Sequence, residues 1–196
     1  MRSVLGLCVL VTLVVAATAT AGSITGKVKC KGARDNSNVL VYVDKIAGKS
    51  FPAPSGHVLM DQKDFKFVPH VLPVLAGTTV DFQNSDKVLH NVYSPDACTG
   101  KFNLGSWPQG QRKSHVFTKA GCESVLLCNV HPEMEGYVVT VETPYYAVSD
   151  KEGNYKIDNI PAGSYTVKVW HEKLKAASQQ VTVGGGAASA SFELSK

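Results

Sequence analysis

The chain is poor in the residues on which several classes of protein depend. Aromatic residues make up 8% of its 196 positions, charged residues make up 18%, and the net charge is only +4. Binding of single-stranded nucleic acid needs aromatic platforms, and phosphate binding needs clustered lysines and arginines, so no nucleic-acid partner is expected. With 44% hydrophobic residues the sequence is too apolar to be disordered. Five cysteines are too few for a disulfide-dominated scaffold.

Long apolar runs are also scarce, and the one present lies at the start. Residues 4–17 are apolar, follow Arg2, and precede the small residues 19–21. This pattern predicts a secretory signal peptide at 1–21 and a mature chain that begins near Gly22. The run is short for a membrane span, and no second one follows, so no membrane-spanning segment is expected. We expect the mature protein in an oxidising compartment, the periplasm or the secreted fraction.

The remaining sequence predicts an all-β protein. Its apolar residues alternate with polar ones in short segments separated by turn residues, whereas residues 172–178 allow one or two helical turns at most. Many short strands at this spacing are typical of β-sandwiches. The strands are expected within 24–30, 39–43, 71–75, 80–82, 124–127, 137–141, 155–157, 165–169 and 191–194.

The residues that carry chemistry lie between 90 and 134. His90 is followed, after 38 positions, by the segment Cys-Asn-Val-His-Pro-Glu-Met at 128–134. One thiolate, two imidazoles and one thioether are the ligands of a blue-copper site, because sulfur favours Cu(I) and imidazole favours Cu(II). Half of a zinc site is the alternative for Cys128 and His131, but zinc would need a second Cys/His pair, and Met134 is a poor zinc ligand. The other mature-chain histidines are interpreted as surface or core residues: His57, His70, His115 and His171.

The segments around these residues resemble the cupredoxins, the blue-copper proteins of the plastocyanin and amicyanin group. The resemblance rests on 77–86, on His-Asn-Val at 90–92, and on the Cys-x2-His-x2-Met spacing, which is similar to that of amicyanin. It covers residues 57–143 and implies a Greek-key β-sandwich that binds one mononuclear type 1 copper. The implied ligands are His90, Cys128, His131 and Met134. Asn91 would hydrogen-bond near the Cys128 sulfur, and His131 would be the ligand through which electrons leave.

Other copper centres are disfavoured by the same segments. A dinuclear centre needs two bridging cysteines within one loop, whereas Cys122 lies six residues before Cys128. A multicopper oxidase needs His-x-His pairs to hold a trinuclear cluster, and the chain has none.

The strand register places two further cysteines. If His90 and Cys128 reach one metal from adjacent antiparallel strands, then Cys98 and Cys122 face each other farther along the same pair. A disulfide there would close a loop and stabilise the folded state by about 3 kcal/mol in the chain-entropy model. The alternative is a pair of free buried thiols. Cys30 is left over and is expected to be a buried free thiol.

The C-terminal segment resembles a second family, the carboxypeptidase regulatory-like or transthyretin-like sandwich. The resemblance rests on Asp-Lys-Glu-Gly-Asn-Tyr at 150–155 and on Pro-Ala-Gly-Ser-Tyr at 161–165. In that family two further strands come before the Asp-x-x-Gly turn. The stretch directly before residue 150 is too short for them, whereas segments 26–28 and 39–43 match their pattern. We therefore divide the mature chain into N-terminal strands at 22–56, a copper domain at 57–143, and a small sandwich at 144–196 that the N-terminal strands complete. The alternative is that the two domains simply follow one another.

These observations predict a protein that carries single electrons between periplasmic redox partners, a donor and an acceptor, and that is not an enzyme. One alternative is copper binding for storage or delivery, without electron transfer. Another is a module that binds glycans or proteins through the C-terminal sandwich, with copper incidental. Asp150 and Glu152 could bind calcium, but a solvated turn is the simpler interpretation.

Overall fold

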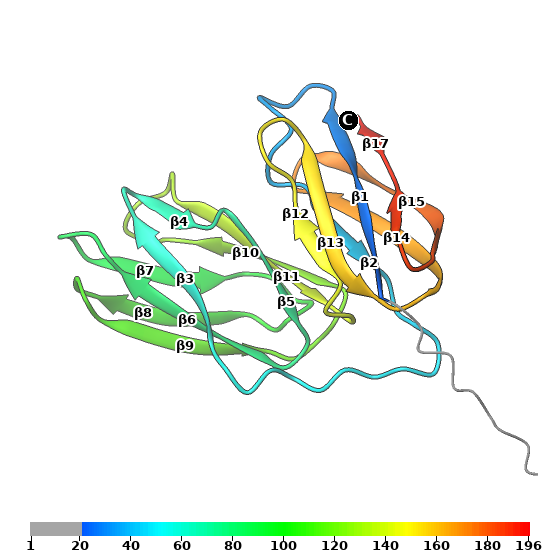
Figure 1. Ribbon diagram of the computed structural model, residues 1–196. Helices are drawn as coiled ribbons and strands as arrows, with labels where there is room; N and C mark the ends of the chain where they lie inside the picture. Colours follow the sequence, from blue (N-terminus) through cyan, green and yellow to red (C-terminus); the bar gives the residue numbers. More distant parts are fainter. Residues whose placement is uncertain (1–20) are drawn as a thin grey trace, which may run out of the picture.

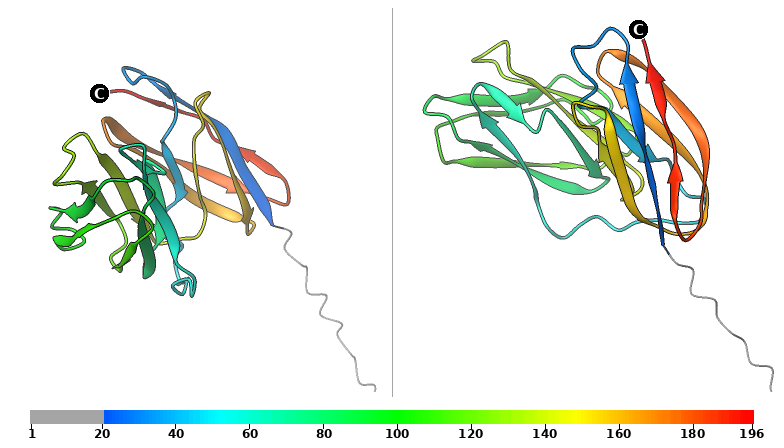
Figure 2. Two further views of the ribbon diagram at one scale, coloured as in Figure 1. Left: turned by 90° about the vertical axis from the view of Figure 1, so that its left-hand side faces the viewer. Right: turned by 45° about the horizontal axis from the view of Figure 1, so that its top comes forward.

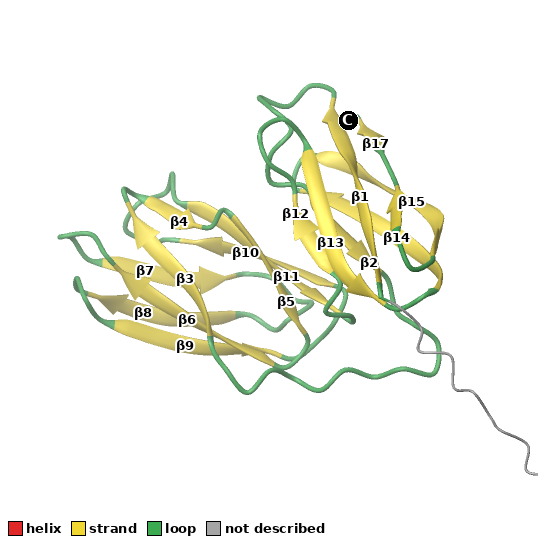
Figure 3. Cartoon of the chain, in the orientation of Figure 1, coloured by secondary structure: helices red, strands yellow, loops and turns green. Residues whose placement is uncertain are grey.

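Two β-sandwiches lie side by side in the computed structural model, which describes residues 21–196 (Figure 1). The described residues form strands, turns and loops, and none of them is helical (Figure 3). The all-β class predicted from the sequence is therefore confirmed. The predicted signal peptide lies outside the described residues, apart from Ala21.

Seventeen strands make up the described part of the chain. They are β1 (Gly22–Cys30), β2 (Leu40–Val43), β3 (Val58–Lys63), β4 (Lys66–Val68), β5 (Val71–Leu75), β6 (Thr78–Asn84), β7 (His90–Ser94), β8 (Phe102–Trp107), β9 (Arg112–Phe117), β10 (Cys122–Leu127), β11 (Glu135–Val141), β12 (Tyr146–Val148), β13 (Asn154–Ile160), β14 (Gly163–His171), β15 (Leu174–Val183), β16 (Ala187–Ser189) and β17 (Phe192–Leu194).

The first sandwich is formed by β3 to β11. One sheet has the strand order β4-β3-β6-β9, and the other has the order β5-β11-β10-β7-β8. Alternate side chains of both sheets meet in one buried core, which includes Phe82 and Phe117 from the first sheet and Leu126 and Val138 from the second. Burial of such side chains contributes about 25 cal/mol per Å² of apolar surface. This core holds the ends of β7 and β10 in fixed positions.

The second sandwich combines both ends of the described chain. Strand β1 pairs with β13, β16 and β17, and β2 pairs with β12 and β14. Its core accordingly contains Ile24 and Val41 from the N-terminal strands together with Ile157 and Val167 from the C-terminal ones. The chain leaves this sandwich after β2, forms the first sandwich, and returns at β12 (Figures 1 and 2).

The two sandwiches share a buried contact. Leu40 and Trp170 of the second sandwich pack against Val71, Val139 and Val141 of the first. The Trp170 and Tyr137 rings also meet edge to face, with 5.3 Å between their centroids. Apolar side chains buried at this contact would be exposed to water if the sandwiches separated, so they stabilise the side-by-side arrangement.

Two details differ from the sequence-based expectations. Residues 172–178, expected to allow a helical turn, mostly belong to β15, which pairs with β14 from Val183 back to Leu174. Cys30 is a free thiol, as expected, but it is half-buried rather than fully buried, and its burial is enough to raise the thiol pKa. Nothing in residues 21–196 forms a helix with the length and apolarity that crossing a membrane requires.

Candidate metal centre

Three side chains from two segments meet at one end of the first sandwich. His90 begins β7, whereas Cys128 and His131 lie in the loop between β10 and β11. The Nδ1 atoms of His90 and His131 are 3.0 Å apart, and the Cys128 sulfur lies 3.9 Å from the His131 Nδ1. In the described part of the chain, these three residues form the cluster of potential metal ligands, with all donor atoms within 4.8 Å of one another.

The spacing of these atoms fits a single metal ion. Metal–nitrogen and metal–sulfur bonds of about 2.0–2.3 Å place the donors of one ion about 3–4 Å apart. His90 and Cys128 are buried and His131 is half-buried, so the donors are largely shielded from water. Two imidazole nitrogens and one thiolate are also the trigonal donor set of blue-copper sites. The residues present therefore fit copper.

Asp86 fixes the orientation of the His90 ring. Its Oδ2 lies 2.8 Å from Nε2 of His90, and a carboxylate at this position accepts a proton held on Nε2, which leaves Nδ1 as the atom that faces the cluster. Burial alone would raise the pKa of Asp86. The backbone N–H groups of Phe65 and Asp64, together with His90, outweigh burial and hold that pKa below its usual value. Asp86 is thus an acceptor for His90 at neutral pH.

The same carboxylate holds a hairpin over the site. Asp64 and Phe65 form the turn between β3 and β4 with φ values of 53° and 57°, and Asp86 accepts both of their backbone N–H groups at 2.9 and 3.0 Å. The turn places the Phe65 ring edge-on against His131 and His90, with centroid distances of 4.9 and 5.8 Å. Both histidine rings are therefore restrained by an aromatic contact.

Cys128 is connected to β7 through Asn91. The backbone N–H of Asn91 donates to the Cys128 sulfur at 3.4 Å, and the Asn91 side-chain oxygen accepts from the N–H of Asn129 at 3.3 Å. These contacts lie where the resemblance to cupredoxins implied them. They restrain both segments that supply ligands.

Met134 ends the loop and begins the return to the core. Its backbone N–H donates to the carbonyl oxygen of His131 at 3.0 Å, which closes a tight turn. Its side chain is fully buried in the same core cluster as Cys128. Met134 thus follows the loop that carries Cys128 and His131 and contributes its side chain to the core that also contains Cys128.

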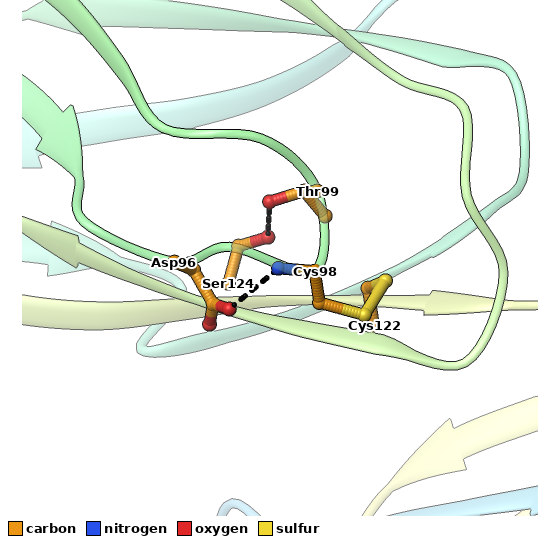
Figure 4. Close-up of a disulfide and its surroundings, with 5 residues drawn as sticks. All are labelled: Asp96, Cys98, Thr99, Cys122 and Ser124. Carbon is orange, nitrogen blue, oxygen red and sulfur yellow. Dashed lines mark hydrogen bonds between the residues drawn. A yellow bond between two sulfur atoms is a disulfide. The ribbon is translucent and has the colours of Figure 1, made fainter.

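The disulfide is found at the opposite end of the strands. Cys98 and Cys122 are bonded, with 5.6 Å between their Cα atoms (Figure 4). Asp96 accepts the backbone N–H of Cys98 at 3.1 Å, and the hydroxyl groups of Thr99 and Ser124 are 2.8 Å apart. The bond therefore ties the loop after β7 to the start of β10, away from Cys128.

The remaining histidines have partners outside the cluster. His57 contacts Asp81 at 2.9 Å, and His115 stacks on Phe102 at 4.0 Å between centroids. His70 contacts Glu172 of the second sandwich at 2.7 Å. His171 accepts the backbone N–H of Lys173 at 3.0 Å. None of these four residues joins the ligand cluster in the described structure.

A cleft of about 520 Å³ lies between the sandwiches next to the cluster. Phe65 and Glu133 line it from the first sandwich, and Arg34, His171 and Lys173 line it from the second. No sequence pattern predicts this cleft, because its walls come from four segments that are far apart in the chain. It places polar side chains of the second sandwich near the loop that carries His131.

Part of the chain matches a known protein family. The family model described as Carboxypeptidase regulatory-like domain matches residues 132–195. The match begins within the ligand loop and includes β11, although β11 pairs with β5 and β10 of the first sandwich. No curated protein matches the chain.

Solved structures that the chain is similar to include copper proteins. A Cu(I) form of an amicyanin mutant is 28% identical, with 45% of this chain and 85% of amicyanin covered and a TM-score of 0.41. A purple cupredoxin from Nitrosopumilus maritimus is 28% identical over 42% of this chain and 98% of its own, with a TM-score of 0.38. A Cu-containing nitrite reductase from Thermus scotoductus SA-01 is 26% identical over 52% of this chain but only 25% of its own, with a TM-score of 0.42. The family match confirms the predicted resemblance to the carboxypeptidase regulatory-like domain within residues 132–195. An amicyanin and a cupredoxin are among the solved structures to which the chain is similar.

Proposed function

We propose that the protein binds one type 1 copper ion and carries single electrons between redox partners. The observation that supports this most strongly is the convergence of His90, Cys128 and His131, whose donor atoms lie within 4.8 Å of one another. Copper bound there supplies the one-electron Cu(II)/Cu(I) couple. We further propose that Met134 is the weak axial ligand, because it follows His131 by three residues and is buried in the same core cluster as Cys128.

Fast electron transfer needs a site that rearranges little when its charge changes. The surrounding side chains are suited to that requirement. Asp86 holds the His90 ring, Asn91 donates to the Cys128 sulfur, and Phe65 lies against both imidazoles. Each ligand is thereby restrained by a neighbour, so the protein matrix favours one arrangement of donors in both oxidation states.

Electrons would enter and leave through His131. It is the most exposed of the three clustered ligands, and apolar side chains around the loops of this end are open to solvent. These side chains are Phe65, Val88, Leu89 and Val130. An apolar rim around an accessible ligand suits brief contact with a donor and then with an acceptor protein.

The further parts of the proposal concern place and mode of action. We propose that the protein works in the periplasm or outside the cell, which agrees with the Cys98–Cys122 disulfide. We also propose that it converts no substrate of its own. The second sandwich would then serve as an accessory domain, through which contact with a glycan or another protein could occur.

Voltammetry of the copper-loaded protein, with the zinc-loaded protein as the matched control, tests the proposal. A reversible one-electron wave with fast electrode kinetics, absent from the control, is the expected result. Copper that binds but exchanges electrons slowly or irreversibly would contradict electron transfer and favour storage or delivery. Failure to bind copper, together with binding to glycans or proteins, would favour the accessory-module alternative.

A further inference from the structure

The strand ladder is irregular next to Asn91, close to the metal centre. Strands β7 and β10 pair at Leu127 and Tyr93 only, and the register between β7 and β8 shifts between Asn91 and Tyr93. Gly105 of β8, with φ of 72°, lies within this irregular stretch. Backbone groups that leave a ladder inside a protein must find other partners.

Asn91 forms hydrogen bonds with residues of several neighbouring segments. Its N–H donates to the Cys128 sulfur at 3.4 Å, and its side-chain amide contacts Asn129 and Asn103 at 3.3 and 2.8 Å. Its carbonyl oxygen accepts from Nε2 of Gln62 at 3.1 Å. Three segments therefore hold one residue, and Gln62 is the partner that comes from the opposite sheet of the sandwich.

Gln62 is an unusual residue for its position. It follows Met60 on the inward face of β3 and has no exposed surface. Its Oε1 atom is buried without a hydrogen-bond partner. Leaving a buried polar atom unpaired costs stability, and an apolar side chain would avoid that cost. The glutamine therefore supplies a hydrogen bond to the Asn91 backbone, although its own oxygen is left unpaired.

We propose that Gln62 is a positioning residue for the metal centre, which acts through Asn91 on the Cys128 sulfur. The N–H and C=O of Asn91 flank one Cα atom, so holding the carbonyl limits the rotation that would turn the N–H away from the sulfur. A hydrogen bond to a thiolate withdraws electron density from it and favours the reduced metal. This inference rests on the proposed copper function.

Gln62→Met is the direct test, because methionine has a similar volume and lacks both amide groups. The variant should still bind one copper. Its sulfur-to-copper absorption band should move to longer wavelength, and its reduction potential should fall, because the sulfur loses its restrained donor. Gln62→Asn, whose amide is one methylene too short to reach Asn91, should shift the band and the potential in the same directions.

Thr140→Val provides the matched control. Thr140 also carries a buried oxygen without a partner, but it pairs with Cys122 at the disulfide end of the same sandwich. This variant should leave the spectrum and the potential unchanged. If Gln62→Met and Gln62→Asn bind copper with the spectrum and potential of Thr140→Val, the proposal is wrong.

A measurement on the metal-free protein separates this proposal from the proposed function. Hydrogen exchange of the Asn91 amide, followed by NMR, should be at least tenfold faster in Gln62→Met than in Thr140→Val. Faster exchange without any copper binding would support the restraint by Gln62 while contradicting the copper function. Equal exchange rates at Asn91 would overturn the proposal even if the protein binds copper.

Discussion

Asp86 and His90 are joined by a contact of 2.8 Å between a carboxylate oxygen and Nε2, four residues apart in the chain. The carboxylate also holds the Asp64–Phe65 turn, so a single side chain connects the first histidine of the cluster to the hairpin that covers it. The orientation of His90 and the position of the Phe65 ring therefore depend on the same residue.

Replacement of Asp86 by alanine should weaken copper binding by about 10- to 100-fold, because partners that orient a metal-bound histidine typically contribute that much. The affinity can be measured by competition with a chelator of known copper affinity. Asp96→Ala is the control, since Asp96 also accepts a backbone N–H but lies at the disulfide end. Equal affinities of the two variants would show that Asp86 does not position His90.

Met134→Leu should keep the copper and its colour but raise the reduction potential. The loss of a weak sulfur donor destabilises Cu(II) more than Cu(I). Met60→Leu is the control, because Met60 is a buried methionine of the same core on strand β3. A potential for Met134→Leu equal to that of Met60→Leu would mean that Met134 is not the axial ligand.

The sequence predicts strands whose apolar residues alternate with polar ones or form a short continuous run, and it does not predict several strands without either pattern. Segment 71–75 agrees with β5, because both faces of that strand are apolar and mostly buried. Strands β8 and β9 are not predicted, since they are edge strands whose side chains are largely exposed and polar. The sequence allows one or two helical turns at most in residues 172–178, but pairing with β14, a contact of tertiary structure, makes most of this segment the start of β15.

Acid should remove a contribution that Asp81 makes to stability. The hydrogen bond from Ser114, at 2.6 Å, is the main cause that lowers the pKa of Asp81, and His57 and Arg112 add to it against the opposing effect of burial. A pKa below the unfolded value of about 3.9 means that this contribution is complete above that pH. It is lost as the pH falls through the folded-state pKa.

Asp81→Asn should therefore lower the free energy of unfolding at pH 7 by about 1 kcal/mol. The difference from the unmodified protein should shrink as the pH falls below about 4 and through the folded-state pKa. Urea unfolding of the metal-free protein at pH 7 and at several lower pH values measures it. Asp158→Asn is the control, because the pair of Asp158 and Lys156 is exposed and contributes little. A difference for Asp81→Asn that stays constant with pH would contradict the assignment.

Truncation tests the division of the chain into domains. A chain of residues 57–143 contains every proposed ligand and the disulfide, so it should fold and bind copper. Its stability should be below that of the whole protein, because Val71, Val139 and Val141 would no longer be buried against the second sandwich. A chain of residues 22–143 should be less soluble than 57–143, since β1 and β2 lose every strand with which they pair.

Solubility and unfolding measurements on both chains provide the check. The opposite ranking, with 22–143 stable and 57–143 unfolded, would show that the first strands stabilise the copper sandwich rather than the second one.

For the metal centre, the sequence indicated the ligands and Asn91, but not the other residues that hold the ligands. His90, Cys128 and His131 could be proposed because their chemistry and spacing are distinctive. Asp86 and Phe65 act through a turn with positive φ values, and no periodic pattern marks such a turn. Gln62 did leave a signal, since a polar residue occupies the inward-facing position after Val58 and Met60. Because no strand was predicted at residues 58–63, the inward-facing position of Gln62 could not be recognised.

The visible absorption spectrum of the oxidised protein after addition of one equivalent of copper tests the central claim most directly. An intense band from charge transfer between the Cys128 thiolate and copper should make the protein blue, and Cys128→Ala should abolish that band. The Cys30→Ala variant, which removes the other free thiol of residues 21–196, should keep it. A colourless protein that binds zinc stoichiometrically and rejects copper would contradict the account.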